Sequence, residues 1–573
     1  MVGARTDAVA IKFCCSRTSG DGRSGPTGRK PGNVGQKVRE QQRREVAETK
    51  AALRHGLRKR GLAEGQGTQK MENNTPDQPD SLRWNQFVLG PEFVKAFPSW
   101  QRVVLGHTWC VTAHPNLNIC QQDQNDNWIA LLGFILDPEN PEATDTEIIE
   151  NLLSMISAFS YFLECIDRFG GRWVIVLYDG LSTKLFHDAC GSRQVFHTDG
   201  NLPLWCASEP ELIADIMRLE VDQEADDFIT LQLARRSLEG WWPGDSSPYK
   251  EIHHLLPNHY LDLATAHPHR YWPRHKLPSV LLNDGVKSVG RILRGVMKAA
   301  SLRFDLSLSV SAGYDSRCLL AASHEIIDQL SFNTVEQIHD SWSNFVDVTI
   351  AGRLLTKLGL RLDLVKETPA IDRSFFEKYM QSSKYPHVYY YPEVQAFYQL
   401  YKRQKVEVTG HASEIGRCYY GTSFTNLKNA GKALASKTRM GWQPFAIRHF
   451  QSWYDRLEDT KGIHPLDLFF WENKLGNWLA MAHAELDIRS RDIVMPFNCR
   501  DLLVKMLGVK EAYRCGPLYV FHKKLIGSLW ADLLSEPINQ LEPPSLKARA
   551  RSRLSAAKQS VRRVKASIAG LGR

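Results

Sequence analysis

Apolar residues in the first half of the chain come in short β-rich runs separated by turn residues. These runs predict strands over residues 103–111, 117–120 and 128–135. A further apolar run over 169–179 ends at Asp179-Gly180, and residues 183–188 are predicted to be its hairpin partner. Between these runs, apolar residues at helical spacing from Ile148 to Ile156 predict a helix over 145–162.

From residue 283 onward, predicted strands and helices alternate. Strands are expected over 306–310, 330–335, 361–365 and 406–408, with helices over 286–300, 341–358 and 479–486. This alternation predicts an α/β fold with a parallel, doubly wound sheet. Ligands of such sheets bind at the carboxyl ends of the strands, so the loops at those ends are the candidate functional segments.

One of these loops carries the residues suited to phosphate chemistry. The segment Ser311-Ala312-Gly313-Tyr314-Asp315-Ser316 follows a buried strand and precedes a helix that is expected from Arg317. Backbone N–H groups at the start of a helix, with the hydroxyls of Ser311 and Ser316, are suited to hold phosphate. Asp315 would repel phosphate unless it held a Mg²⁺ that bridges phosphate oxygens. Ala312 fits this loop only if its φ is negative.

Composition and charge narrow the class of protein. The chain has 573 residues, 43% of them hydrophobic and 24% charged, which is ordinary for a soluble protein of two or more domains. No apolar run of about 18 residues is present, so no transmembrane helix is predicted. The net charge of +9 divides into +10 for residues 1–70, +9 for 547–573 and −10 for the region between them. The basic character therefore lies in the two ends, and the acidic body is not expected to bind nucleic acid.

The ends and the cysteines lead to further expectations. Residues 1–82 are predicted to be a disordered basic extension, with Met71 as an alternative start, and 546–573 a basic tail. The 11 cysteines form no Cys-x-x-Cys pair. Their scatter favours reduced thiols and a cytoplasmic location over a disulfide framework or a zinc site.

Several motifs, in order along the chain, resemble one family. The loop at 311–316 is similar to the SGGxDS signature of the PP-loop ATP pyrophosphatases, in the branch that contains asparagine synthetase. Residues 169–179 and 183–198 resemble the pattern of the class II glutamine amidotransferase domain. The resemblance implies an N-terminal αββα Ntn-type amidotransferase-like sandwich over 83–275. A doubly wound PP-loop ATP pyrophosphatase domain would follow over 283–545.

The same resemblance implies functional residues. Residues 406–417 resemble the family's SGEGSDE segment, and 492–497 resemble VEARVPFLD. Asp315 and Glu414 would then hold Mg²⁺, and His411, supported by Asp492, would take a proton from the attacking amine. The ATP-binding residues would be Val310, Ser311, Ala312, Gly313, Asp315, Ser316, Thr334, Thr409 and Gly410. A late catalytic lysine of the family has three candidates here: Lys523, Lys524 and Lys547.

The chain departs from the family at its amidotransferase half. Glutamine-using members begin with a nucleophilic Cys, whereas Val2 follows Met1 and Glu72 follows Met71. We therefore expect this half not to hydrolyse glutamine. A second departure is His411, which stands where asparagine synthetases have a Glu.

The implied activity is that of an AMP-forming carbon–nitrogen ligase that adenylates a carboxylate and passes the acyl group to ammonia or an amine. Three alternatives remain open: asparagine formation, an amide or macrolactam in a metabolite or precursor peptide, and a degenerate paralogue that only binds nucleotide or a partner. The last belongs to a different functional class, and retention of Ser311, Asp315, Ser316 and Glu414 argues against it. A homodimer is one alternative for its assembly.

Overall fold

The computed structural model describes residues 83–539, apart from residues 107, 235–238, 339–340, 425–428 and 442. The expected extension over 1–82, the basic tail over 546–573 and Lys547 lie outside the described residues.

Two antiparallel sheets form the first part of the described chain. Their strands are β1 (Phe87–Gly90), β2 (Gln101–Leu105), β3 (Trp109–Ala113), β4 (Ile119–Gln124), β5 (Asn127–Leu136), β6 (Gly170–Tyr178), β7 (Thr183–His187), β8 (Phe196–Thr198), β9 (Cys206–Ala207), β10 (Ile252–His254), β11 (His259–Asp262) and β12 (His267–Arg270). One sheet has the order β10-β8-β9-β1-β3-β2 and the other β12-β11-β7-β6-β5-β4. The predicted hairpin of β6 and β7 is confirmed, with Tyr178 opposite Thr183.

Alternating side chains of these strands build the layers of a sandwich. On β5, Ala130 and Leu132 pack between the two sheets, whereas Ile129 and Leu131 face helices α2 (Asp145–Leu153) and α3 (Phe159–Ile166). On the other sheet, Val88 faces α4 (Pro210–Met217). The order helix, sheet, sheet, helix is the predicted αββα arrangement.

Two predictions in this half were wrong in detail. Residues 103–111 form two strands, because the chain turns at Gly106, whose φ of 53° lies in the left-handed region that glycine adopts readily. The helix expected over 145–162 is two helices. The Ser154 hydroxyl donates to the Asn151 carbonyl (2.7 Å) at the end of α2, a side-chain bond that competes with continuation of the helix.

The second part contains a fully parallel sheet. Its strands are β13 (Leu306–Ser309), β14 (Leu330–Glu336), β15 (Leu362–Lys366), β16 (Val406–Val408) and β17 (Ile493–Val494), in the order β15-β14-β13-β16-β17. Every pairing in this sheet is parallel, so the predicted doubly wound arrangement is confirmed. The strand order reverses between β13 and β16, and this reversal is where open α/β sheets bind ligands.

Helices alternate with these strands along the chain. They include α6 (Leu282–Arg303), α7 (Tyr314–Ala322), α8 (Trp342–Lys357), α9 (Arg373–Gln381), α10 (Tyr391–Tyr401), α11 (Ala430–Lys437), α12 (Pro444–Asp455), α13 (Pro465–Phe469), α14 (Ala480–Leu486), α15 (Arg500–Gly508), α16 (Glu511–Arg514) and α17 (Val520–Leu529), with α5 (Gln223–Ala234) earlier in the chain. Helices α7, α8 and α10 pack on the sheet. A π-helical segment, η9 (Phe470–Leu479), runs directly into α14. Within the described ranges, the helices are all too short or too polar to cross a bilayer.

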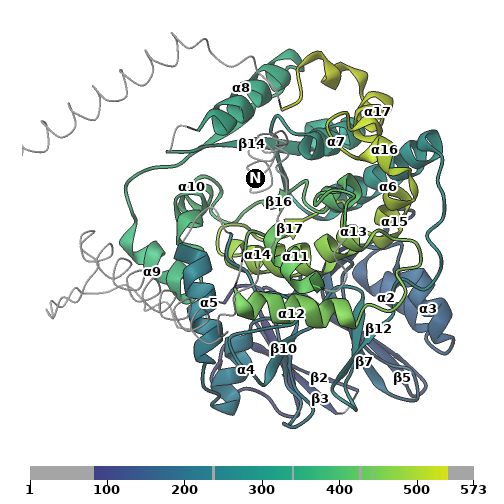
Figure 1. Ribbon diagram of the computed structural model, residues 1–573, viewed down its shortest axis with the longest axis vertical. Coiled ribbons are helices and arrows are strands. Elements are labelled where there is room, and N and C mark those ends of the chain that lie inside the picture. Colours follow the sequence, from purple (N-terminus) through teal and green to yellow (C-terminus); the bar gives the residue numbers. More distant parts are fainter. Residues whose placement is uncertain are drawn as a thin grey trace, which may run out of the picture.

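The two parts share one buried boundary. Figure 1 shows the antiparallel strands at one end of the molecule and β14 and β16 towards the other, with α12 and α14 between them. At this boundary Arg172 on β6 forms a two-point ion pair with Asp487 (2.6 and 3.0 Å). Both side chains are almost fully buried, so each compensates the charge of the other.

Candidate active site

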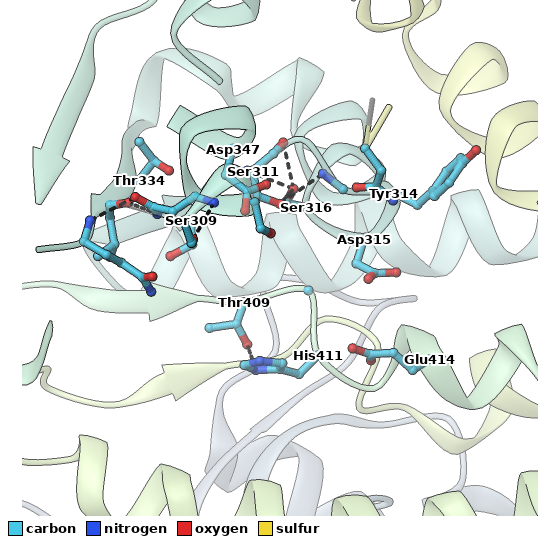
Figure 2. Close-up of a pocket in the computed structure, with 18 of the residues that line it drawn as sticks. Ser309, Ser311, Tyr314, Asp315, Ser316, Thr334, Asp347, Thr409, His411 and Glu414 are labelled. Atoms are coloured by element: carbon cyan, nitrogen blue, oxygen red, sulfur yellow. Dashed lines mark hydrogen bonds between the residues drawn. The ribbon is translucent and has the colours of Figure 1, made fainter. Parts of the chain in front are cut away.

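A pocket lies where the strand order of the parallel sheet reverses. Its walls come from the loop after β13, the end of β14, the first turns of α8, and the segment that follows β16. It contains about 890 Å³ of empty space, including the part that is open to solvent. Figure 2 shows Ser311, Ser316 and Asp315 on one side of this space and Thr409, His411 and Glu414 on the other.

The loop after β13 is held by its own hydroxyl groups. Ser311 N–H donates to Ser316 Oγ (3.1 Å), the two serine hydroxyls are 2.9 Å apart, and Gly313 N–H donates to Ser311 Oγ (3.1 Å). Helix α7 begins at Tyr314, earlier than the expected Arg317, with Gly313 as its N-cap. Asp315 and Ser316 therefore lie in the first turn of the helix, where the backbone N–H groups have no intrahelical acceptor and the helix dipole favours an anion.

Helix α8 contributes a carboxylate to the same loop. Asp347 Oδ1 accepts the N–H of Ala312 (2.9 Å), and burial raises the pKa of the Asp347 carboxyl. Ala312 does not have a positive φ, so its methyl group is tolerated here, as expected. Asn344 lies one turn before Asp347 on the same helix and also lines the pocket.

The segment after β16 touches the loop backbone to backbone. A Cβ added at Gly410 would lie 2.8 Å from Asp315 Cβ and 3.0 Å from Ser316 N. Glycine is therefore required at position 410 for the two segments to approach this closely.

Asp315 and Glu414 face the pocket from these two segments, with Arg417 beside both. Arg417 Nη2 lies 2.9 Å from Asp315 Oδ2 and 3.7 Å from Glu414 Oε1. The other carboxylate oxygen of Asp315, Oδ1, is buried and has no hydrogen-bond partner among the described residues. Asp315 and Glu414 are thus close enough to contact one cation, and in this structure that cation is the guanidinium of Arg417.

The charge of the pocket bears on what it can bind. Its lining contains the carboxylates of Asp315, Asp347 and Glu414, and Arg417 carries the only positive charge among the lining residues that the structure describes. An excess of acidic groups repels a polyphosphate, unless a divalent cation enters with it. In the described part of the chain, no three His, Cys, Asp or Glu side chains are grouped to hold a metal ion. Two carboxylates fit Mg²⁺ nevertheless, because Mg²⁺ is commonly bound by one or two carboxylates plus substrate phosphates and water.

His411 lies on the wall opposite the loop. Its Nδ1 is 3.0 Å from Thr409 Oγ1, while its Nε2 is buried without a hydrogen-bond partner among the described residues. Burial, together with the Arg489 guanidinium, lowers the pKa of His411 well below its usual value. The imidazole is therefore neutral at pH 7 and is a weaker base than an ordinary histidine.

Most of the residues expected from the sequence meet in this pocket. Those that line it are Ser311, Gly313, Asp315, Ser316, Thr334, Thr409, Gly410, His411 and Glu414. Ala312 contributes its N–H to Asp347 instead, and Val310 is fully buried with its N–H donated to the Asn333 carbonyl (2.8 Å).

Asp492 is not among the lining residues. Its Oδ1 pairs with Arg172 (2.9 Å) and its Oδ2 with Arg193 (3.1 Å), both from the part of the chain that forms the antiparallel sheets. Another acid of this region, Glu485 on α14, is buried against His387 and Tyr379. The structure therefore places Asp492 at the boundary between the two parts and away from the lining of the pocket.

Other site residues were missed from the sequence. Asn344, Asp347 and Arg417 line the pocket, and their spacing offered a signal, since Asn344 and Asp347 are three residues apart on a predicted helix and Arg417 follows Glu414 by three. Lys523 and Lys524 are exposed on α17 and do not line the pocket.

The expectation of reduced thiols was wrong for one pair. Cys418, directly after Arg417, forms a disulfide with Cys515 at the end of α16. The two residues are far apart in sequence but their Cα atoms lie 5.5 Å apart, within the range that a disulfide requires. Sequence spacing alone could not reveal this proximity.

No family model matches the chain, and no curated protein sequence matches it. Among solved structures, glutamine-dependent NAD⁺ synthetase from Acinetobacter baumannii in complex with ADP is similar over 34% of this chain and 42% of its own, with 14% identity and a TM-score of 0.18. The tRNA thiolase NcsA from Methanococcus maripaludis matches 44% of this chain and 78% of its own, at 11% identity and a TM-score of 0.18.

Glutamine PRPP amidotransferase from B. subtilis, complexed with ADP and GMP, matches 52% of this chain and 63% of its own, at 10% identity and a TM-score of 0.20. The chain thus spans less than half of the NAD⁺ synthetase and less than two thirds of the amidotransferase. At this identity and coverage the similarities are partial, and they assign no function to this chain.

Proposed function

We propose that this protein is an ATP-dependent, AMP-forming ligase that joins a carboxylate to ammonia or an amine. The observation that carries the proposal is the meeting of two segments at the reversal of the parallel sheet. The loop after β13 brings two serine hydroxyls, the carboxylate of Asp315 and the N-terminus of α7. The segment after β16 brings the carboxylate of Glu414 and the imidazole of His411. Together they supply groups for phosphate, for a divalent cation and for a proton.

In this proposal the first turn of α7 and the hydroxyls of Ser311 and Ser316 bind the phosphates of ATP. Asp315 and Glu414 would hold Mg²⁺, which neutralises charge on the departing pyrophosphate when it is bound. A substrate carboxylate attacks the α-phosphate, pyrophosphate leaves, and an acyl-adenylate forms. Arg417 would move from the two carboxylates towards the phosphates as the cation takes its place.

The second step would use His411. An amine that attacks the acyl-adenylate becomes acidic as its nitrogen gains positive charge, so even a weakly basic imidazole can accept its proton. If Nδ1 of His411 donates to Thr409 Oγ1, Nε2 presents its lone pair for that proton. Asp492 would influence this step only through the packing of the two parts of the chain.

We also propose that the amidotransferase-like half does not hydrolyse glutamine. Burial raises the pKa of the Cys120 thiol to about 12 and places those of Cys190 and Cys206 above their usual range. A thiol with a raised pKa is a poor nucleophile at neutral pH, because the thiolate is the reactive form. Free ammonia or an amine would then be the nitrogen donor, and the product would be asparagine or an amide in a metabolite or peptide.

A second candidate function is nucleotide binding without catalysis. It is favoured by the pairing of Arg417 with Asp315 and Glu414, because a guanidinium that stays between the acids would exclude Mg²⁺. The two candidates differ in whether Arg417 leaves the carboxylates when MgATP binds.

The test is formation of AMP and pyrophosphate from ATP by the full-length protein. Aspartate and a panel of other carboxylates are each supplied with ammonium, with glutamine or with hydroxylamine, which traps acyl-adenylates as hydroxamates. The proposal predicts multiple turnovers of pyrophosphate with at least one carboxylate in the presence of ammonium or hydroxylamine. When glutamine is the nitrogen source it predicts no more than one equivalent of pyrophosphate per protein chain, from the first adenylation. MgATP binding without pyrophosphate across the panel would favour the non-catalytic candidate, and turnover with glutamine would overturn the inactive amidotransferase half.

A further inference from the structure

The disulfide between Cys418 and Cys515 is attached directly to the candidate ATP site. Cys418 is the residue after Arg417 and ends the short helical turn η7 (Ser413–Arg417), which carries both Glu414 and Arg417. Its partner, Cys515, ends α16 and lies five residues before α17 begins. The bond therefore connects the segment that bears two charged site residues to the C-terminal helices.

The backbone of this segment is strained at both ends. Ala412 has a φ of 74° and Cys418 a φ of 52°, both in the left-handed region that residues with a Cβ avoid. Each such conformation costs free energy and persists only when its surroundings hold it. The position of η7 therefore depends on the contacts that fix it from outside.

Besides the disulfide, η7 is attached to the C-terminal helices by packing, which includes the Arg417 guanidinium over the Tyr519 ring, and by hydrogen bonds. Ser413 Oγ lies 3.2 Å from His522 Nε2 on α17, and Arg514 Nη1 donates to the Gly416 carbonyl at 3.3 Å. Both distances are at or just beyond the long end of the range for hydrogen bonds, so each contact is weak. The covalent bond is the strongest of these attachments, and it acts on the strained residue itself.

We propose that Cys418–Cys515 is a reversible redox modification site that sets the affinity of the neighbouring pocket for nucleotide. A small or protein dithiol attacks Cys515 Sγ through its thiolate, the S–S bond breaks, and its electron pair leaves on Cys418 Sγ. The second thiol of the reductant then displaces Cys515, so that the reductant becomes a disulfide and the protein gains two thiols. Reduction frees Cys418 to leave the left-handed region, and Arg417 and Glu414 lose their fixed position.

The surroundings of the bond suit this chemistry. Cys418 is buried, whereas Cys515 is partly exposed and is followed by exposed Gly516, Pro517 and Leu518. A reductant can therefore approach Cys515 from solvent, and Cys515 is the more accessible of the two residues.

The experiment compares full-length protein oxidised with oxidised glutathione and the same protein reduced with dithiothreitol. Alkylation followed by mass spectrometry shows the state of each cysteine, hydrogen exchange reports on residues 409–418, and calorimetry gives the Kd for ATP with Mg²⁺. We expect exchange in this segment to be at least tenfold faster, and the Kd at least fivefold weaker, in the reduced protein. Reoxidation should reverse both changes.

Replacing both residues, Cys418→Ser with Cys515→Ser, should reproduce the reduced behaviour and abolish the response to dithiothreitol. Cys165→Ser, a matched change on α3 far along the chain, should leave the response intact. The proposal is overturned if both cysteines are alkylated after oxidation, or if exchange and Kd are the same in the two redox states of the wild type. The ATP readout rests on the proposed function. If the oxidised protein binds no ATP, the proposed function fails, and the exchange rates alone decide the redox proposal.

Discussion

The Arg417 guanidinium lies between two carboxylates, with Nη2 2.9 Å from Asp315 Oδ2 and 3.7 Å from Glu414 Oε1. It holds the place proposed for a divalent cation. Replacing Arg417 with Met removes this competitor and should tighten Mn²⁺ binding in the absence of nucleotide by about tenfold. A tenfold change in affinity corresponds to ~1.4 kcal/mol. This is a fraction of the ~4 kcal/mol by which two unit charges 4 Å apart interact at an effective dielectric constant of 20. Electron paramagnetic resonance of Mn²⁺ measures the affinity.

The matched control is Arg448→Met, since Arg448 is half-exposed and pairs with Glu224 on the surface. Its Mn²⁺ affinity should equal that of the wild type. Unchanged or weaker Mn²⁺ binding by a folded Arg417→Met protein would show that the two acids do not form a cation site.

The contact between Gly410 and the loop after β13 leads to a second prediction. An added Cβ would lie 2.8 Å from Asp315 Cβ, so Gly410→Ala must push the two segments apart. We expect ATP affinity to fall at least tenfold and the free energy of unfolding to drop by about 1–3 kcal/mol. Gly352→Ala on α8 is the control, because nothing lies within 4 Å of its added Cβ, and alanine should stabilise that helix by up to ~1 kcal/mol. Equal ATP affinity in both variants would refute the required close approach.

A substitution of Asp492 tests whether this residue stabilises the fold or takes part in the chemistry. Asp492→Asn leaves the buried Arg193 without its charged partner and weakens the pairing of Arg172, so we expect a loss of about 3 kcal/mol in the free energy of unfolding. Asp501→Asn, which breaks a half-exposed i,i+4 pair with Lys505, should cost less than ~1 kcal/mol. Denaturant unfolding measures both. A stable Asp492→Asn protein without ligase activity would assign Asp492 to the chemistry instead.

Buried neutral histidines predict sensitivity to acid. Burial lowers the pKa of His197 to about 4 and of His254 to about 3. In the unfolded chain these residues bind protons below about pH 6.5, whereas in the folded protein they do not, so acid favours unfolding. Stability should be fully present above pH 6.5 and fall as the pH drops towards 4, by about 2 kcal/mol per histidine at pH 5. Thermal unfolding at pH 7 and pH 5 measures this, and an unchanged midpoint would contradict it.

Local patterns in the sequence predicted the parallel sheet and its phosphate loop. The strands β13, β14, β15 and β16 lie within one or two residues of their expected bounds, because each is a short apolar run between clear turn signals. Asp315 was found on the same grounds, because it lies in the loop that follows a buried strand, whereas Glu414 was expected only from the resemblance of residues 406–417 to a family motif.

Long-range contacts could not be predicted in this way. The pairing of Asp492 with Arg172 and Arg193 joins residues about 300 positions apart, and nothing in their local sequence indicates it. The disulfide of Cys418 with Cys515 depends on the packing of α16 against η7. Such contacts follow from how the two parts of the chain pack, which spacing along the sequence does not contain.

The central claim is that Asp315 and Glu414 hold ATP together with a divalent cation, and calorimetric titration with ATP tests it most directly. The wild type should bind ATP with a Kd below about 1 mM when Mg²⁺ is present and lose binding when EDTA removes it, because the excess of acidic groups in the pocket repels the bare triphosphate. Asp315→Asn should bind at least tenfold more weakly, while Asp305→Asn, a change at an exposed pair with Lys405, should bind like the wild type. Binding of ATP by the wild type that is equally strong with EDTA, or unchanged in Asp315→Asn, would contradict this claim.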